Sequence, residues 1–71
     1  MNSKLRLQDL PLGTILFDKR FNAFYVVLQL TEKSSTFLYL AANYKEIFTS
    51  YDEKGMWDNY INHANVLVIH A

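Results

Sequence analysis

The side chains that could perform acid–base, nucleophilic or metal chemistry are few and scattered along the sequence. The only histidines are His63 and His70, and Asp58 is the carboxylate nearest to them. Structural zinc usually requires four ligands at short paired spacings, and this pattern is missing. The chain also has no cysteine, and hence neither a thiolate ligand nor a thiol nucleophile. We therefore expect no metal site and no cofactor.

The sequence also lacks the residue arrangements that covalent or acid–base catalysis requires. The serines at Ser34-Ser35 and Ser50 lie in or near expected turns, without a motif that would place a base beside them. The carboxylates of Asp52-Glu53 are neighbours in an expected polar turn, where water would solvate both. Such solvation does not shift their pKa values apart, so one could not act as the acid and the other as the base. Gly13 and Gly55 are the only glycines, which is too few for a loop that cradles phosphate. We expect that the protein is not an enzyme.

Aromatic side chains are the remaining chemical feature, and they crowd residues 44–60. Phe48 and Trp57 could simply complete the core, and this alternative stays open. Five tyrosines are costly to bury together, because each buried hydroxyl needs a hydrogen-bond partner. Partly exposed Tyr and Trp dominate the energetics of protein interfaces. We therefore expect a surface that binds another protein, formed by Tyr44, Lys45, Tyr51, Trp57 and Tyr60.

A different class of function is also open: single-stranded nucleic acid could stack its bases on exposed tyrosines. The candidate residues are Tyr25 and Tyr39 for stacking, with Lys19 and Arg20 for phosphate contacts. Seven basic residues balance seven acidic ones, and this zero net charge argues against nucleic acid as the main partner. A third alternative is a structural subunit that assembles with its own copies.

The strongest structural signal is the segment Phe24–Thr31, which contains no Gly, Pro or charged residue. Its β-branched, aromatic and aliphatic residues favour a strand. Because successive side chains of a strand point to opposite faces, Phe24, Val26, Leu28 and Leu30 share one wholly apolar face. We expect this face to lie on the core, with Leu28 near its centre.

Further strands are expected on either side of this segment. Thr14–Phe17 follows the turn signal Pro11-Leu12-Gly13, and Thr36–Ala41 follows a polar turn at Glu32–Ser35. Val66–His70 is a closing strand that is apolar on both faces, so we expect one face to be covered either by residues 42–64 or by another copy of the chain in a homodimer or larger assembly.

Residues 42–64 allow two interpretations. As a helix, residues 43–51 would begin at Asn43 with Glu46 in a capping-box position. As a hairpin, Glu46–Tyr51 would pair with Met56–Asn59 around residues 52–55. Strand propensity at residues 49–51 favours the hairpin, with a short helix or 3₁₀ segment still expected somewhere within residues 43–64.

Short strands and tight turns predict a mainly β fold with antiparallel pairing, in one domain over residues 1–71. The order of a Gly-led strand at residues 10–17, a polar loop, then Phe24–Leu30 and its hairpin resembles an SH3-like small barrel. This resemblance implies a closed barrel of five to six strands. It is a likeness of fold and carries no ligand specificity.

Composition also bears on where in the cell the protein is found. The chain has 71 residues, is 51% hydrophobic and has no apolar run long enough to span a bilayer. The absence of cysteine favours a reducing compartment, so we expect a cytoplasmic protein without membrane contact. The chain is similar in type to the small accessory proteins of bacteriophages and mobile elements, which implies that it inhibits a larger host protein.

Overall fold

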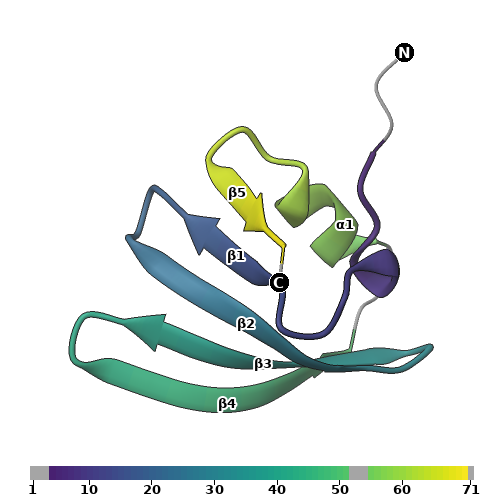
Figure 1. Cartoon of the computed structure of the whole chain (residues 1–71), viewed down its shortest axis with the longest axis horizontal. Coiled ribbons are helices and arrows are strands. Elements are labelled where there is room, and N and C mark those ends of the chain that lie inside the picture. The colour runs from purple at the N-terminus through teal and green to yellow at the C-terminus, as the bar shows by residue number, and fades with distance from the viewer. Residues whose placement is uncertain (1–3, 52–54, 71) are drawn as a thin grey trace.

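The computed structural model describes residues 4–51 and 55–70, and it shows a single antiparallel sheet with a short helix packed on one face (Figure 1). The spatial order of the strands is β4-β3-β2-β1-β5, so β4 and β5 form the two edges and the sheet is open. The expected antiparallel β fold and its short helix are confirmed, whereas closure into a barrel is not observed. In chain order the elements are η1 (Leu7–Asp9, a 3₁₀ turn), β1 (Ile15–Asp18), β2 (Ala23–Leu30), β3 (Ser34–Ala41), β4 (Tyr44–Tyr51), α1 (Met56–Ile61) and β5 (Val66–Ile69).

Tight turns join β1 to β4 into an uninterrupted meander. Between β2 and β3, Thr31 Oγ1 accepts a hydrogen bond of 3.0 Å from the Ser34 backbone N–H, which fixes the predicted hairpin. Only two residues join β3 to β4, and Asn43 adopts φ +60° in the left-handed region that Asn tolerates better than most residues. The long β2-β3-β4 hairpins therefore form the main body of the sheet.

The second half of the chain differs in part from both interpretations of its sequence. Residues 44–51 are a strand, as the hairpin interpretation required, but they pair with β3. Residues 56–59, the expected partner, belong to helix α1. The turn at Ala42-Asn43 explains the difference, because it returns the chain directly onto β3. The expected polar turn at residues 52–54 lies outside the described residues.

The core lies between the sheet and α1, and its side chains show that the predicted inner face of β2 was wrong. Val27 on β2 and Phe37 on β3 are fully buried, while Leu28 is 40% exposed on the opposite face. A bulge between Val27 and Gln29 interrupts the alternation, so that Leu30 returns to the core side. The physical reason is that both faces of β2 are apolar, and the helix covers the one that carries Tyr25.

Two apolar residues in the first third of the chain lie in opposite environments. Leu7 lies in η1 and is fully buried, and its backbone N–H donates to Asp58 Oδ1 at 2.9 Å. Phe21 is 69% exposed in the β1–β2 turn, with the Arg20 guanidinium over its ring. Over the described part of the chain, neither helical segment has the length and apolar character to cross a membrane.

Candidate functional site

A row of side chains crosses the sheet on its helix-covered face and joins β2, β3 and β4. Tyr25 lies directly opposite Tyr39, and Tyr39 lies directly opposite Glu46. The rings of Tyr25 and Tyr39 are 4.9 Å apart between centroids, and those of Tyr39 and Tyr44 are 5.9 Å apart. Three tyrosines from three adjacent strands therefore form a continuous aromatic surface.

Two shallow hollows adjoin this row and share Tyr25 between them. One hollow, of about 190 Å³, lies between Tyr25 and helix α1, and the other, of about 250 Å³, lies over β3 and β4. We call the combined surface the tyrosine groove. It is lined by Tyr25, Tyr39, Glu46, Phe48, Met56, Trp57 and Tyr60.

The groove exists because helix α1 is shorter than the sheet that it covers. Trp57 packs on Phe37 with 4.4 Å between ring centroids, and its Nε1–H donates to Ser50 Oγ at 2.9 Å. Helix α1 has only six residues, less than two turns, and they pack around this contact. The face of β3 and β4 beyond Trp57 is therefore left uncovered by the described residues. Trp57 is 8% exposed, so it belongs to the core and only borders the groove.

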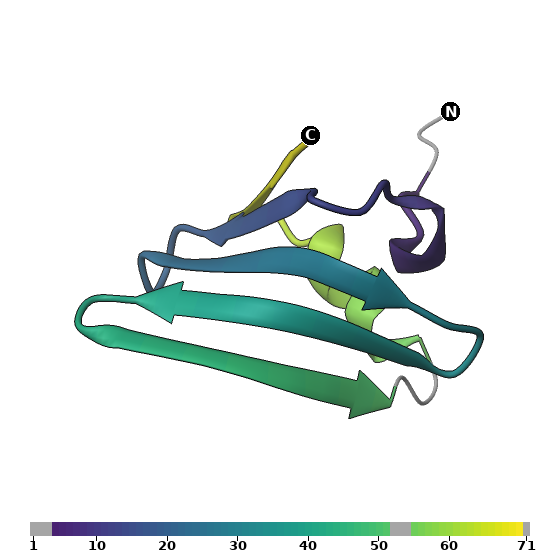
Figure 2. The same cartoon turned by 60° about the horizontal axis from the view of Figure 1, so that its bottom comes forward.

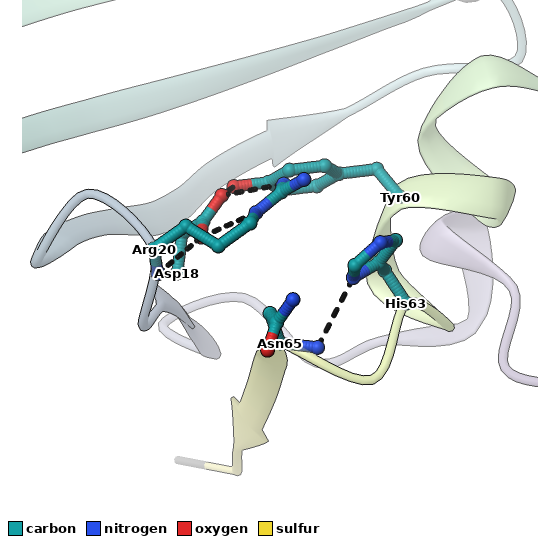
Figure 3. Close-up of polar contacts among 5 residues, drawn as sticks. All are labelled: Asp18, Arg20, Tyr60, His63 and Asn65. Atoms are coloured by element: carbon teal, nitrogen blue, oxygen red, sulfur yellow. Dashed lines mark hydrogen bonds and ion pairs between the residues drawn. The ribbon is translucent and has the colours of Figure 1, made fainter.

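The opposite wall of the groove is held by a polar cluster at the end of β1 (Figure 3). Asp18 is almost fully buried, and its carboxylate accepts hydrogen bonds from Arg20 Nε at 3.1 Å and Nη2 at 2.9 Å. The Tyr60 hydroxyl donates to Oδ2 of the same carboxylate at 2.6 Å. This cluster ties α1 to β1 and fixes the Tyr60 ring at the mouth of the groove.

Charge within this cluster is balanced. The guanidinium of Arg20 holds the pKa of Asp18 down, from 3.8 to about 2, and the Tyr60 hydroxyl adds to that effect while burial opposes it. Burial and the neighbouring carboxylate raise the pKa of Tyr60 well above its ordinary value. Asp18 is therefore ionised and Tyr60 neutral at physiological pH, and most of the charge of Arg20 is compensated by its partner.

Glu46, an exposed residue of the edge strand β4, lines the groove at its rim, and its carboxylate gives the groove a negative character. It accepts a hydrogen bond from the Tyr44 hydroxyl at 3.0 Å, which raises the pKa of that tyrosine. Among the described residues, the one ion pair is that of Asp18 and Arg20, so no described cation neutralises Glu46. The groove thus combines aromatic faces, tyrosine hydroxyls and one accessible carboxylate.

The structure divides the residues that the sequence singled out between two faces of the sheet. Tyr44 lies next to Tyr39, beside the groove but not among its lining residues, and Tyr60 forms part of the groove's wall. Lys45 and Tyr51 alternate with Glu46 along β4 and therefore lie on the opposite face. The expected protein-binding cluster is thus not one continuous surface.

Of the four residues weighed for nucleic acid, only the two tyrosines lie together. Tyr25 and Tyr39 are adjacent in the groove, whereas Arg20 is engaged by Asp18 and Lys19 is exposed in the β1–β2 turn. Glu46 and Met56 were missed as groove residues. The sequence around Glu46 and Met56 gives no sign of this location, because strand register and the position of α1 bring the two residues into the groove.

Metal ligands do not gather in the part of the chain that the structure describes, where no group of three or more His, Asp or Glu side chains could hold an ion. His63 has a structural role in the turn that precedes β5, because its Nδ1 accepts the Asn65 backbone N–H at 3.1 Å (Figure 3).

Comparison with known proteins adds no identification, since no protein-family model, no curated protein and no solved structure matches the chain.

Proposed function

We propose that this protein is a non-enzymatic interaction module that binds an extended segment of another protein in the tyrosine groove. The observation that carries the proposal is the row Tyr25–Tyr39–Glu46, in which two rings and a carboxylate lie side by side on three strands. Helix α1 packs against Tyr25 through Trp57 and Tyr60, and Tyr39 and Glu46 continue the row across β3 and β4. Tyrosine offers a large contact area at low cost in rotamer entropy, and its hydroxyl tolerates water while the partner is absent.

The chemistry of the groove favours a particular kind of segment. Aromatic faces attract apolar side chains and also cations, which lie over the negative face of a ring. Glu46 would pair with a Lys or Arg of the partner, and a rim charge of this kind contributes orientation and association rate as much as affinity. The preferred ligand is therefore an extended segment in which a basic residue stands beside apolar ones.

A displayed library of random peptides, selected on the wild-type protein, tests this proposal. We expect enrichment of peptides with a Lys or Arg flanked by apolar residues. Glu46→Gln should weaken their binding about fivefold to tenfold, because a charge-assisted contact is lost. The same substitution at Glu32, in the β2–β3 turn, is the matched control and should leave binding unchanged. The proposal would be overturned if no peptides were enriched, or if the enriched peptides bound Glu46→Gln and Glu32→Gln equally well.

A second candidate, binding of single-stranded nucleic acid, has one observation in its favour. Tyr25, Tyr39 and Tyr44 follow one another at ring distances of 4.9 and 5.9 Å, which suits successive stacking of bases. Glu46 and the compensated charge of Arg20 oppose it, because phosphates need unpaired cations. Fluorescence anisotropy with a labelled oligonucleotide at low and moderate salt decides between the two. Tight, salt-sensitive binding that Tyr39→Ala abolishes would favour nucleic acid.

A broader biological role is also a proposal. We propose that the module acts in the cytoplasm as a phage-type inhibitor of a host protein, and its small size and cysteine-free composition support this role. The relation to SH3-like barrels is likewise a proposal, supported by the antiparallel meander from β1 to β4.

A further inference from the structure

The face of the sheet opposite to helix α1 carries a broad apolar area, bordered by a polar row of Gln29, Thr36 and Thr49, and it has no part in the groove. Strand register places side chains on this face in two rows that cross the whole sheet. Leu28 joins them from the bulge in β2. We call this surface the outer sheet face. Its rows are Ile69–Ile15–Val26–Leu38–Ile47 and Leu67–Phe17–Phe24–Leu40–Lys45.

Both helical segments of the described chain pack on the other side. Leu7 of η1 and Trp57 and Ile61 of α1 all belong to the core cluster, together with Val27 and Phe37 of the inner face. Figure 2 shows the sheet from the outer side, with α1 lying behind its strands. Side chains of the outer face are consequently left exposed or partly exposed, and Ile47 is 65% exposed.

We propose that the outer sheet face is a homodimer interface, on which a second copy of the chain packs sheet against sheet. This inference is independent of the proposed groove function, because the two surfaces lie on opposite sides of the sheet. Packed sheets align at about 30° and lie about 10 Å apart, and two copies of one sheet have the same twist and therefore satisfy this geometry together.

The size of the face identifies its occupant. Five strands about 4.8 Å apart and five residues along β2 give a face of roughly 400 Å², within the range of about 300–600 Å² for the largest apolar patch of a typical monomer, which often has a function. A single helix about 10–12 Å wide would cover only half of the five strands. A second sheet of the same width covers all of them, and two such faces bury roughly 800 Å², which suits a weak, concentration-dependent dimer.

Charge points to the same occupant. Lys45 is the one charged side chain in the two rows, and it stands on the edge strand β4, where its ammonium group can reach water. A lipid surface would require a cluster of basic residues, which the rows lack. With zero net charge, two copies approach one another without long-range repulsion. Phe17 and Phe24, whose rings stack at 4.7 Å, lie near the middle of the face.

Sedimentation velocity from about 5 to about 500 µM tests the dimer, since weak interfaces assemble over this range. Leu67→Lys places a charge on the outer sheet face, and Leu12→Lys makes the same change at an exposed loop position outside it. We expect wild type and Leu12→Lys to approach twice the monomer mass. Leu67→Lys should dimerise at least tenfold more weakly, with an unchanged circular dichroism spectrum.

A second measurement does not depend on the folding of Leu67→Lys. The chain has no cysteine, so Phe24→Cys carries a single thiol at the centre of the face, and a short bis-maleimide should join two copies efficiently. Leu12→Cys is the control and should cross-link poorly. A wild-type monomer at every concentration, equal dimerisation of both lysine variants, or binding of the face to neutral lipid vesicles in place of a second copy would overturn the proposal.

Discussion

The hydroxyl of Tyr60 donates a hydrogen bond of 2.6 Å to Oδ2 of Asp18, a residue 42 positions earlier in the chain. This bond joins the helix to β1, at the opposite side of the core from the contact of Trp57 with β4. It also fixes one wall of the tyrosine groove. The relationship between these two residues therefore connects the stability of the fold to the shape of its candidate site.

Replacing Tyr60 by Phe removes this hydroxyl and leaves the ring in place. We expect the free energy of unfolding to fall by about 1–2 kcal/mol, because a hydrogen bond to an ionised, buried acceptor is lost. Tyr44→Phe is the matched control, since its hydroxyl bonds to exposed Glu46, and it should cost less than about 0.5 kcal/mol. Urea unfolding followed by Trp57 fluorescence measures both. Equal losses in the two variants would show that Tyr60 does not hold Asp18.

Stability should depend on pH through Asp18. The pKa of this carboxyl is about 2 in the folded protein and 3.8 without its partners, so the folded state favours the ionised form. This contribution is fully present above about pH 4 and is lost as the pH falls towards 2. Melting temperatures measured between pH 6 and pH 2 should therefore fall more steeply for wild type than for Asp18→Asn. Parallel curves would contradict the assigned ionisation of Asp18.

Core and surface positions on adjacent strands should differ sharply. Phe37 is fully buried among aromatic rings, and Phe37→Ala should destabilise the protein by about 3–5 kcal/mol through the lost contacts and the cavity left behind. Leu28 is 40% exposed, and Leu28→Ala should cost less than about 1 kcal/mol in the monomer. The two variants are compared by urea unfolding at a low protein concentration, where dimers are absent. A larger loss for Leu28 than for Phe37 would reverse the assignment of the faces.

The strands were predictable because their alternation and turns are local signals. The face of β2 was not, since Phe24 and Val26 on one side are as apolar as Val27 on the other. Alternation alone cannot decide which apolar face a helix will cover. The bulge at Leu28 also interrupts the alternation of inward and outward side chains, and nothing in the sequence predicts it.

A short helix was expected within residues 43–64, but the position of helix α1 in that range was not predicted, because six residues are too few to show a helical period. The candidate site was predicted only in part for a related reason. Tyrosines were expected at a binding surface, but the adjacency of Tyr25, Tyr39 and Glu46 depends on strand register, which long-range packing determines.

Nuclear magnetic resonance of the ¹⁵N-labelled protein, titrated with the best peptide from the selection, tests the central claim most directly. We predict that the largest shifts fall on Tyr39, Glu46, Phe48 and the Trp57 indole. Tyr39→Ala should weaken binding about thirtyfold, as expected for an interface anchor, while Tyr51→Ala on the opposite face leaves it unchanged. Shifts confined to the outer sheet face or to the β1–β2 turn, or equal affinity of the two variants, would contradict the assignment of the tyrosine groove as the binding site.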